Sequence, residues 1–108
     1  MQYLSLQQGA QKVLRLSERM LAHAEQGDWD LLSGLESERS RSLESLFSHP
    51  QINDNLGEIA DTLYEVISID KQCIRLGEQA RKTMLSQLNR QSQGGRALNS
   101  YRQNADGM

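Results

Sequence analysis

Apolar residues recur every three or four positions over the first quarter of the chain, which is the spacing of an amphipathic α-helix. This stripe begins at Tyr3, includes Val13 and ends at Ala24, with Ser17 filling a gap in it. Gly27 then suits the left-handed residue that follows a helix, and the next residue suits the cap of a new helix. We therefore expect a first helix over about residues 2–25, followed by a tight antiparallel turn.

Two further helical patterns follow. Residues 29–48 carry a narrow apolar face with Arg39 set into it, and Pro50 disfavours helix in the residue before it. Residues 52–91 carry two adjacent apolar stripes in a near-heptad rhythm. Two stripes make a face broad enough to contact both preceding helices. The pattern leaves open which of the two faces inward.

The end of the chain shows a hinge-like pattern. Gly94 and Gly95 predict a hinge, and Leu98 and Tyr101 share one side of a short helix within residues 93–104. Residues 105–108 are predicted to be a disordered tail. Together the patterns predict an all-α fold: an antiparallel three-helix bundle over residues 1–92, with a long third helix, and a short C-terminal fourth helix.

Composition supports the all-α prediction. The 108 residues include 16 leucines against 7 valines and isoleucines together, and a single proline. Unbranched helix formers thus outnumber the β-branched residues that strands prefer. The longest uninterrupted apolar run is three residues, from Met20 to Ala22, so we expect no membrane insertion.

Residues that carry chemistry are few. His23 and His49 lie at the ends of different predicted helices, without the spacing of a metal site. Cys73 falls within the apolar rhythm, where a small buried hydrophobic side chain is the simplest interpretation. We therefore predict no catalytic residues, no cofactor, no metal and no enzymatic activity. A lone cysteine and no recognisable leader favour the cytoplasm.

Charge is unevenly distributed although the formal net charge is only -2. Residues 71–102 hold seven Lys and Arg against one acidic residue, Glu78. Only one aromatic residue accompanies these basic side chains, so a solvated face or an acidic protein partner is favoured over direct nucleic-acid binding.

Two charged residues interrupt the apolar stripes. Arg39 lies in the second helix and Asp70 near the middle of the third, at comparable distances from the turn near residue 50. One interpretation is a partly buried ion pair that fixes the register of the helices. The alternatives are a role in binding a partner, or two side chains that simply reach solvent.

Around the first turn, residues 24–32 read Ala-Glu-Gln-Gly-Asp-Trp-Asp-Leu-Leu, and Leu35, Glu36, Arg39 and Leu43 follow. This block resembles the FliT family of flagellar export chaperones. Further along, Ile67, Asp70 and Ile74 fit the third-helix rhythm of the family, and residues 96–101 resemble its C-terminal segment that ends in a tyrosine. The likeness covers roughly residues 10–102.

The resemblance implies a cytoplasmic chaperone of flagellar type III export. Such proteins keep the filament-cap protein FliD unassembled. The second and third helices of the chaperone largely form a groove that binds the C-terminal helical segment of FliD. The last helix, here with Leu98 and Tyr101, can fold over this groove as a regulatory lid. Further partners implied are the export ATPase FliI, the export gate FlhA and the transcription regulator FlhDC.

Apolar residues of the second and third helices are the candidates for this groove. The pattern does not separate groove from bundle core among Leu35, Leu43, Leu46, Leu63, Val66, Ile67 and Ile74. Trp29 is interpreted as a core anchor in preference to a partner contact. For Tyr101, docking of the last helix and plain packing both remain open.

Two other functions compete with the client-binding chaperone. One is a structural or regulatory homodimer whose extra apolar surface is covered by a second copy. The other is a small anti-activator of a transcription complex. A hinge followed by a short apolar helix favours the chaperone, because a movable lid suits a ligand groove better than a permanent dimer core.

Overall fold

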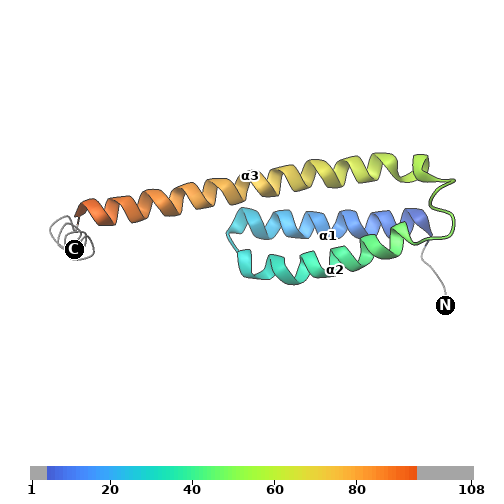
Figure 1. The fold of residues 1–108 in the computed structure, drawn as a ribbon, viewed down its shortest axis with the longest axis horizontal. Coiled ribbons are helices and arrows are strands. Elements are labelled where there is room, and N and C mark those ends of the chain that lie inside the picture. Colours follow the sequence, from blue (N-terminus) through green and yellow to red (C-terminus); the bar gives the residue numbers. More distant parts are fainter. Residues whose placement is uncertain (1–4, 95–108) are drawn as a thin grey trace, which may run out of the picture. The chain divides into compact units, whose positions relative to one another are not determined.

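Three α-helices make up the part of the chain that the structure describes. The computed structural model describes residues 5–94, and Figure 1 shows α1 (Leu6–Gln26), α2 (Trp29–Phe47) and α3 (Leu56–Gly94). No strand occurs among these residues. The all-α prediction and the long third helix are confirmed. Residues 93 and 94 of the predicted hinge segment continue α3, and the rest of the predicted fourth helix, with Leu98 and Tyr101, and the predicted tail lie outside the described residues.

Helix α1 is capped at both ends. The Ser5 hydroxyl accepts from the Gln8 backbone N–H at 3.1 Å, and the Gln8 side chain accepts from the Ser5 N–H at 3.0 Å. This capping box fixes the start at Leu6, not near residue 2, because Ser5 is extended. Gly27 ends the helix in the left-handed conformation, with φ 77°, as the sequence predicted.

The connection between α2 and α3 is longer than predicted. Residues 48–55 form successive turns, in which the Ile52 N–H donates to the His49 carbonyl at 3.1 Å and the Asn55 side chain donates to the Gln51 carbonyl at 2.9 Å. Helix α3 therefore begins at Leu56 instead of near residue 52. The turns place Ile52 in the core, where it packs in one cluster with Leu46.

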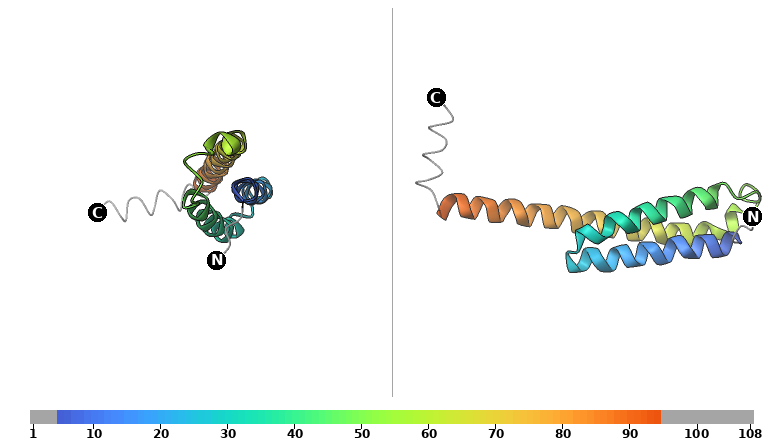
Figure 2. Two further views of the ribbon diagram at one scale, coloured as in Figure 1. Left: turned by 90° about the vertical axis from the view of Figure 1, so that its right-hand side faces the viewer. Right: turned by 90° about the horizontal axis from the view of Figure 1, so that it is seen from below.

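The chain divides into two compact units, residues 1–77 and residues 78–108, and α3 contributes to both. In the first unit α1, α2 and the start of α3 surround a common core, as the end-on view in Figure 2 shows. Consecutive helices run antiparallel in this unit, so the bundle prediction is confirmed for it. Three clusters form the core: Leu6, Ala10, Leu46, Ile52 and Ile59; Val13, Leu14 and Val66; Leu16, Met20 and Leu35.

The second unit is described over residues 78–94, all of them helical. Within this described stretch, the large apolar side chains of Met84, Leu85 and Leu88 are exposed. None of the helices described is both long and apolar enough to cross a membrane.

Candidate partner-binding face and its polar centre

Helix α3 carries an exposed apolar stripe beside its buried one. Ile59 and Val66 point into the core, whereas Ile67 is 49% exposed and Ile74 is 61% exposed. Leu56, Leu63, Ile67 and Ile74 are separated by seven, four and seven residues, which places them on one side of a helix. We name these four residues the α3 stripe.

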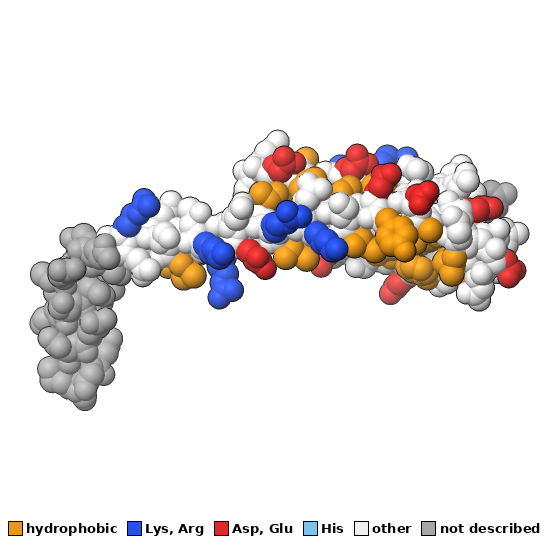
Figure 3. Space-filling model, turned by 90° about the horizontal axis from the view of Figure 1, so that it is seen from above, with side chains coloured by type: hydrophobic (Ala, Val, Ile, Leu, Met, Phe, Trp, Pro, Cys, Tyr) orange, Lys and Arg blue, Asp and Glu red, His pale blue; other side chains and the backbone are white. Residues whose placement is uncertain are grey.

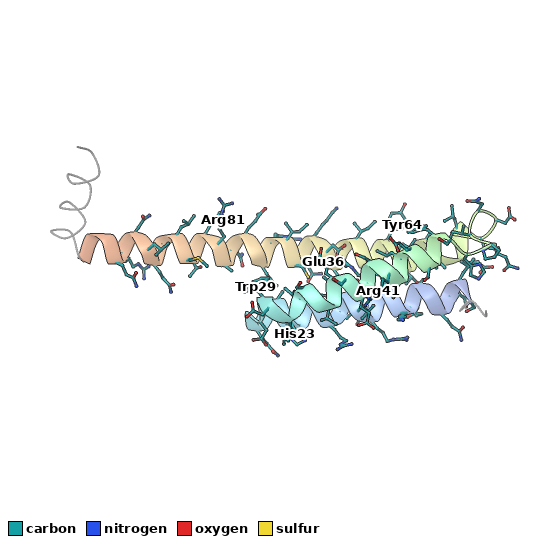
Figure 4. All side chains as sticks on the ribbon, turned by 60° about the horizontal axis from the view of Figure 1, so that its bottom comes forward. His23, Trp29, Glu36, Arg41, Tyr64 and Arg81 are labelled. Atoms are coloured by element: carbon teal, nitrogen blue, oxygen red, sulfur yellow. The ribbon has the colours of Figure 1, made fainter. Side chains whose placement is uncertain are left out.

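Aromatic and apolar side chains extend this surface near the start of α3. Tyr64 is exposed and points away from α1 and α2 (Figure 4). Figure 3, which looks onto α3, shows apolar side chains gathered toward the end of the first unit where α3 begins. Exposed apolar side chains gathered on one surface in this way are typical of an interaction site.

The α3 stripe lies on the side of α3 that is next to α2. Asp70 stands three residues after Ile67 and four before Ile74, and its carboxylate contacts Arg39 of α2. On α2, the half-buried Leu43 packs against the cluster of Val13, Leu14 and Val66, and the exposed Phe47 follows one turn later. We call the surface made of Leu43, Phe47 and the α3 stripe the α2–α3 face.

A polar centre joins all three helices beneath this face. One nitrogen of Arg39, Nη1, donates to Asp70 Oδ1 and, at 3.0 Å, to the hydroxyl of Ser17 on α1. The Ser17 hydroxyl in turn donates to the Val13 carbonyl at 2.9 Å. The Arg39 side chain is 14% exposed and that of Asp70 is 37% exposed. The structure therefore brings together the two charges that the sequence singled out.

The partner that sequence reasoning missed is Ser17. This residue is almost fully buried, although it was taken only as a gap in the apolar stripe of α1. A hydroxyl at a core position requires a hydrogen-bond partner. The Val13 carbonyl of the same helix already accepts its proton, so the available signal was only the hydroxyl oxygen, which could still accept from another helix.

The electrostatics near this centre keep Cys73 unreactive. Burial and, next, the negative charge of Asp70 raise the pKa of the Cys73 thiol, while Arg39 acts in the opposite direction. The thiol is therefore protonated at neutral pH and is a poor nucleophile. The side chain is nevertheless only half-buried and belongs to none of the three core clusters, so it is less buried than the sequence suggested.

The structure divides the candidate groove residues by burial. Leu35, Leu46 and Val66 are buried in the core, Leu43 and Leu63 are half-buried, and only Ile67 and Ile74 are exposed. Leu98 and Tyr101 lie outside the described residues.

Trp29 does not anchor the core as expected. It lies at the first position of α2, near the turn after α1 (Figure 4), and is 37% exposed. Leu16, Met20 and Leu35 form the core cluster nearest this turn without it. The histidine at this turn, His23, has its Nδ1 3.8 Å from the Asp28 carboxylate. Residues 5–94 contain no group of three or more His, Cys, Asp or Glu side chains that could hold a metal ion.

A comparison with known protein families identifies the family to which this chain belongs. The family described as "Flagellar protein FliT" matches residues 8–104, nearly the whole chain. The chain belongs to the FliT family. The match covers the three helices of the FliT-family bundle and continues beyond the described residues. No curated protein and no solved structure matches the chain.

Proposed function

We propose that this FliT-family protein is a cytoplasmic chaperone of flagellar export that binds the C-terminal helical segment of the filament-cap protein FliD. The observation that carries the proposal is the α2–α3 face, because it exposes an apolar stripe at helical spacing on a flagellar protein. Such a surface fits the apolar side of an amphipathic helix.

Covering the face supplies the free energy of binding. A fully buried isoleucine contributes about 1.5–3 kcal/mol relative to an exposed one, so Ile67 and Ile74, each near half exposure, would contribute roughly 1 kcal/mol apiece. The client would bury its own apolar helix face in the same step. The surface through which FliD assembles would then stay covered until the export apparatus, with FliI and FlhA, receives the complex.

The C-terminal segment is proposed to regulate this face. Residues 93–104, with Leu98 and Tyr101, would form a helix that competes with the client. Deletion of residues 94–108 should then strengthen client binding, measured by calorimetric titration of a C-terminal fragment of FliD. Unchanged or weaker binding would contradict the lid. A regulatory contact with FlhDC is proposed to use the same C-terminal segment.

A homodimer is the competing function, because a second copy could also cover the α2–α3 face. Two measurements separate these functions. Sedimentation of the free protein shows whether it forms a stable dimer, and titration with the FliD segment shows whether it binds its client one to one. A stable dimer that does not bind the FliD segment would support the competing function.

The decisive experiment removes the exposed isoleucines while keeping the fold. Ile67→Ser combined with Ile74→Ser should weaken binding of the FliD C-terminal segment by roughly 30-fold, because two apolar contacts are lost. Thermal unfolding should change little, since both side chains are already half exposed.

A matched control comes from the other side of α2. Leu31 is 54% exposed, and it stands twelve residues before Leu43, which turns it about 120° around the helix axis. Leu31→Ser should therefore bind the FliD segment within about twofold of the wild type. Equal losses in both variants would show that the α2–α3 face is not the client site.

A further inference from the structure

The polar centre has unused hydrogen-bonding capacity on its outer side. Arg39 donates only through Nη1, and Asp70 accepts only through Oδ1. Across residues 5–94 the one buried side-chain polar atom without a partner is His23 Nδ1. The remaining N–H groups of Arg39 and the Asp70 Oδ2 atom, which have no partner among the described residues, therefore meet solvent. The ion pair thus offers both a donor and an acceptor to a further polar group.

This pair lies toward the Ile74 end of the α2–α3 face, one turn before Leu43 on α2. Asp70 is flanked along the helix by Ile67 and Ile74, the two exposed residues of the α3 stripe. A purely apolar partner helix laid across the face would remove water from both polar groups without replacing its hydrogen bonds. Leaving a charged group without partners in an interface weakens binding strongly. The bound helix must therefore carry polar atoms at this point.

The chemistry of the pair selects the group that fits. The outer atoms of Arg39 only donate and Asp70 Oδ2 only accepts, whereas a carboxamide does both through its C=O and NH₂. An ammonium group would satisfy Asp70 alone, and a carboxylate would satisfy Arg39 while it repelled Asp70. Because Arg39 is far less exposed than the neighbouring isoleucines, a long stem is needed to reach it.

We propose that the Arg39–Asp70 pair is a specificity-determining point that receives a carboxamide side chain, glutamine by its reach, from the apolar face of the bound helix. The proposal rests on the proposed function, in which that helix is the C-terminal segment of FliD. Ser17 acts as a positioning residue, because its hydrogen bond holds Arg39 beneath the face.

The first test replaces the pair with apolar side chains of similar size. Arg39→Met combined with Asp70→Leu leaves Ser17 hydrogen-bonded to the Val13 carbonyl, so no new buried polar atom loses its partner. Exchanges of this kind preserve folds. The double variant should bind the FliD segment about 10- to 100-fold more weakly than the wild type, because the carboxamide loses both partners.

The second test changes the client in the reciprocal way. Each glutamine and asparagine of the FliD segment is replaced by leucine in turn. One of these replacements should weaken binding to the wild-type protein by about 10- to 100-fold. The same replacement should strengthen binding to the double variant, because leucine then meets apolar side chains. If the pair had a purely structural role, the wild type and the double variant would not differ in whether they prefer an amide or a leucine at one position of the FliD segment.

A milder variant guards against misfolding. Asp70→Asn can keep an acceptor for Arg39 but presents an NH₂ group outward, so binding should still fall by about tenfold. Circular dichroism and thermal unfolding verify the fold of each variant.

The outcomes separate this proposal from the proposed function. Absence of binding to the wild type would overturn both. Normal wild-type binding with an equally tight double variant would overturn only the polar point. Reciprocal rescue at a lysine or arginine of the segment, in place of an amide residue, would also overturn it.

Discussion

Helices α1 and α2 are consecutive and similar in length, with 21 and 19 residues, yet they are buried very differently. Nine residues of α1 are buried, from Leu6 to Ala24, whereas α2 buries only Leu35 and Leu46. Helix α1 is therefore the centre of the first unit. Helix α2 is held by two apolar anchors and by the polar contact of Arg39.

This difference explains how a small bundle keeps a surface free for a partner. A helix with many buried residues has few left to present, and α1 leaves none of its large apolar residues exposed among those described. Helix α2 exposes Trp29, Leu31 and Phe47. The face proposed for client binding accordingly lies beside the lightly anchored helix.

The largest expected effect comes from removing an α2 anchor. Leu46→Ala should lower the free energy of unfolding by about 3 kcal/mol, because Leu46 is buried among Leu6, Ala10 and Ile59 and its loss leaves a cavity. Chemical denaturation measures this change. Leu31→Ala on the exposed side of the same helix is the control, with an expected change below about 0.5 kcal/mol. Similar values for both would contradict the two-anchor description of α2.

An intermediate effect is expected at the polar contact. Arg39→Ala should lower the free energy of unfolding by about 1–2 kcal/mol, since it removes hydrogen bonds to Ser17 and to a carboxylate that water can still reach. Thermal and chemical denaturation measure it. A variant with the full stability of the wild type would refute the proposal that the pair fixes the register of the helices.

The smallest effect is expected at the cap of α1. Ser5→Ala removes the capping box and should lower the free energy of unfolding by about 1 kcal/mol. Because nine buried residues hold α1, denaturation should remain a single cooperative transition. A loss exceeding that of Leu46→Ala would reverse the comparison between the two helices.

Much of the fold was predictable because helical periodicity and punctuation act locally. Gly27 marked the end of α1, and Trp29 marked the start of α2, as the structure has them. Ser5 and Gln8 also carried a start signal, the Ser-x-x-Gln capping box, which the apolar stripe obscured. The stripe likewise extended through Ile52, although that residue belongs to a turn whose hydrogen bonds depend on residues 49–55.

The candidate site was less predictable because apolar residues look alike in a pattern. Leu46 and Val66 are core residues, and Ile67 and Ile74 are exposed, yet all four are apolar at helical spacing. Only the packing of α1 and α2 against α3 separates them. Arg39 and Asp70 were identifiable because a charge within an apolar stripe is costly unless it finds a partner.

The central claim is that the α2–α3 face binds the C-terminal helix of FliD. Its most direct test is calorimetric titration of the free protein with that segment at several temperatures, with sedimentation of the protein alone. The account predicts one-to-one binding with a negative heat-capacity change, the mark of buried apolar surface. Absence of binding together with a stable dimer would contradict it.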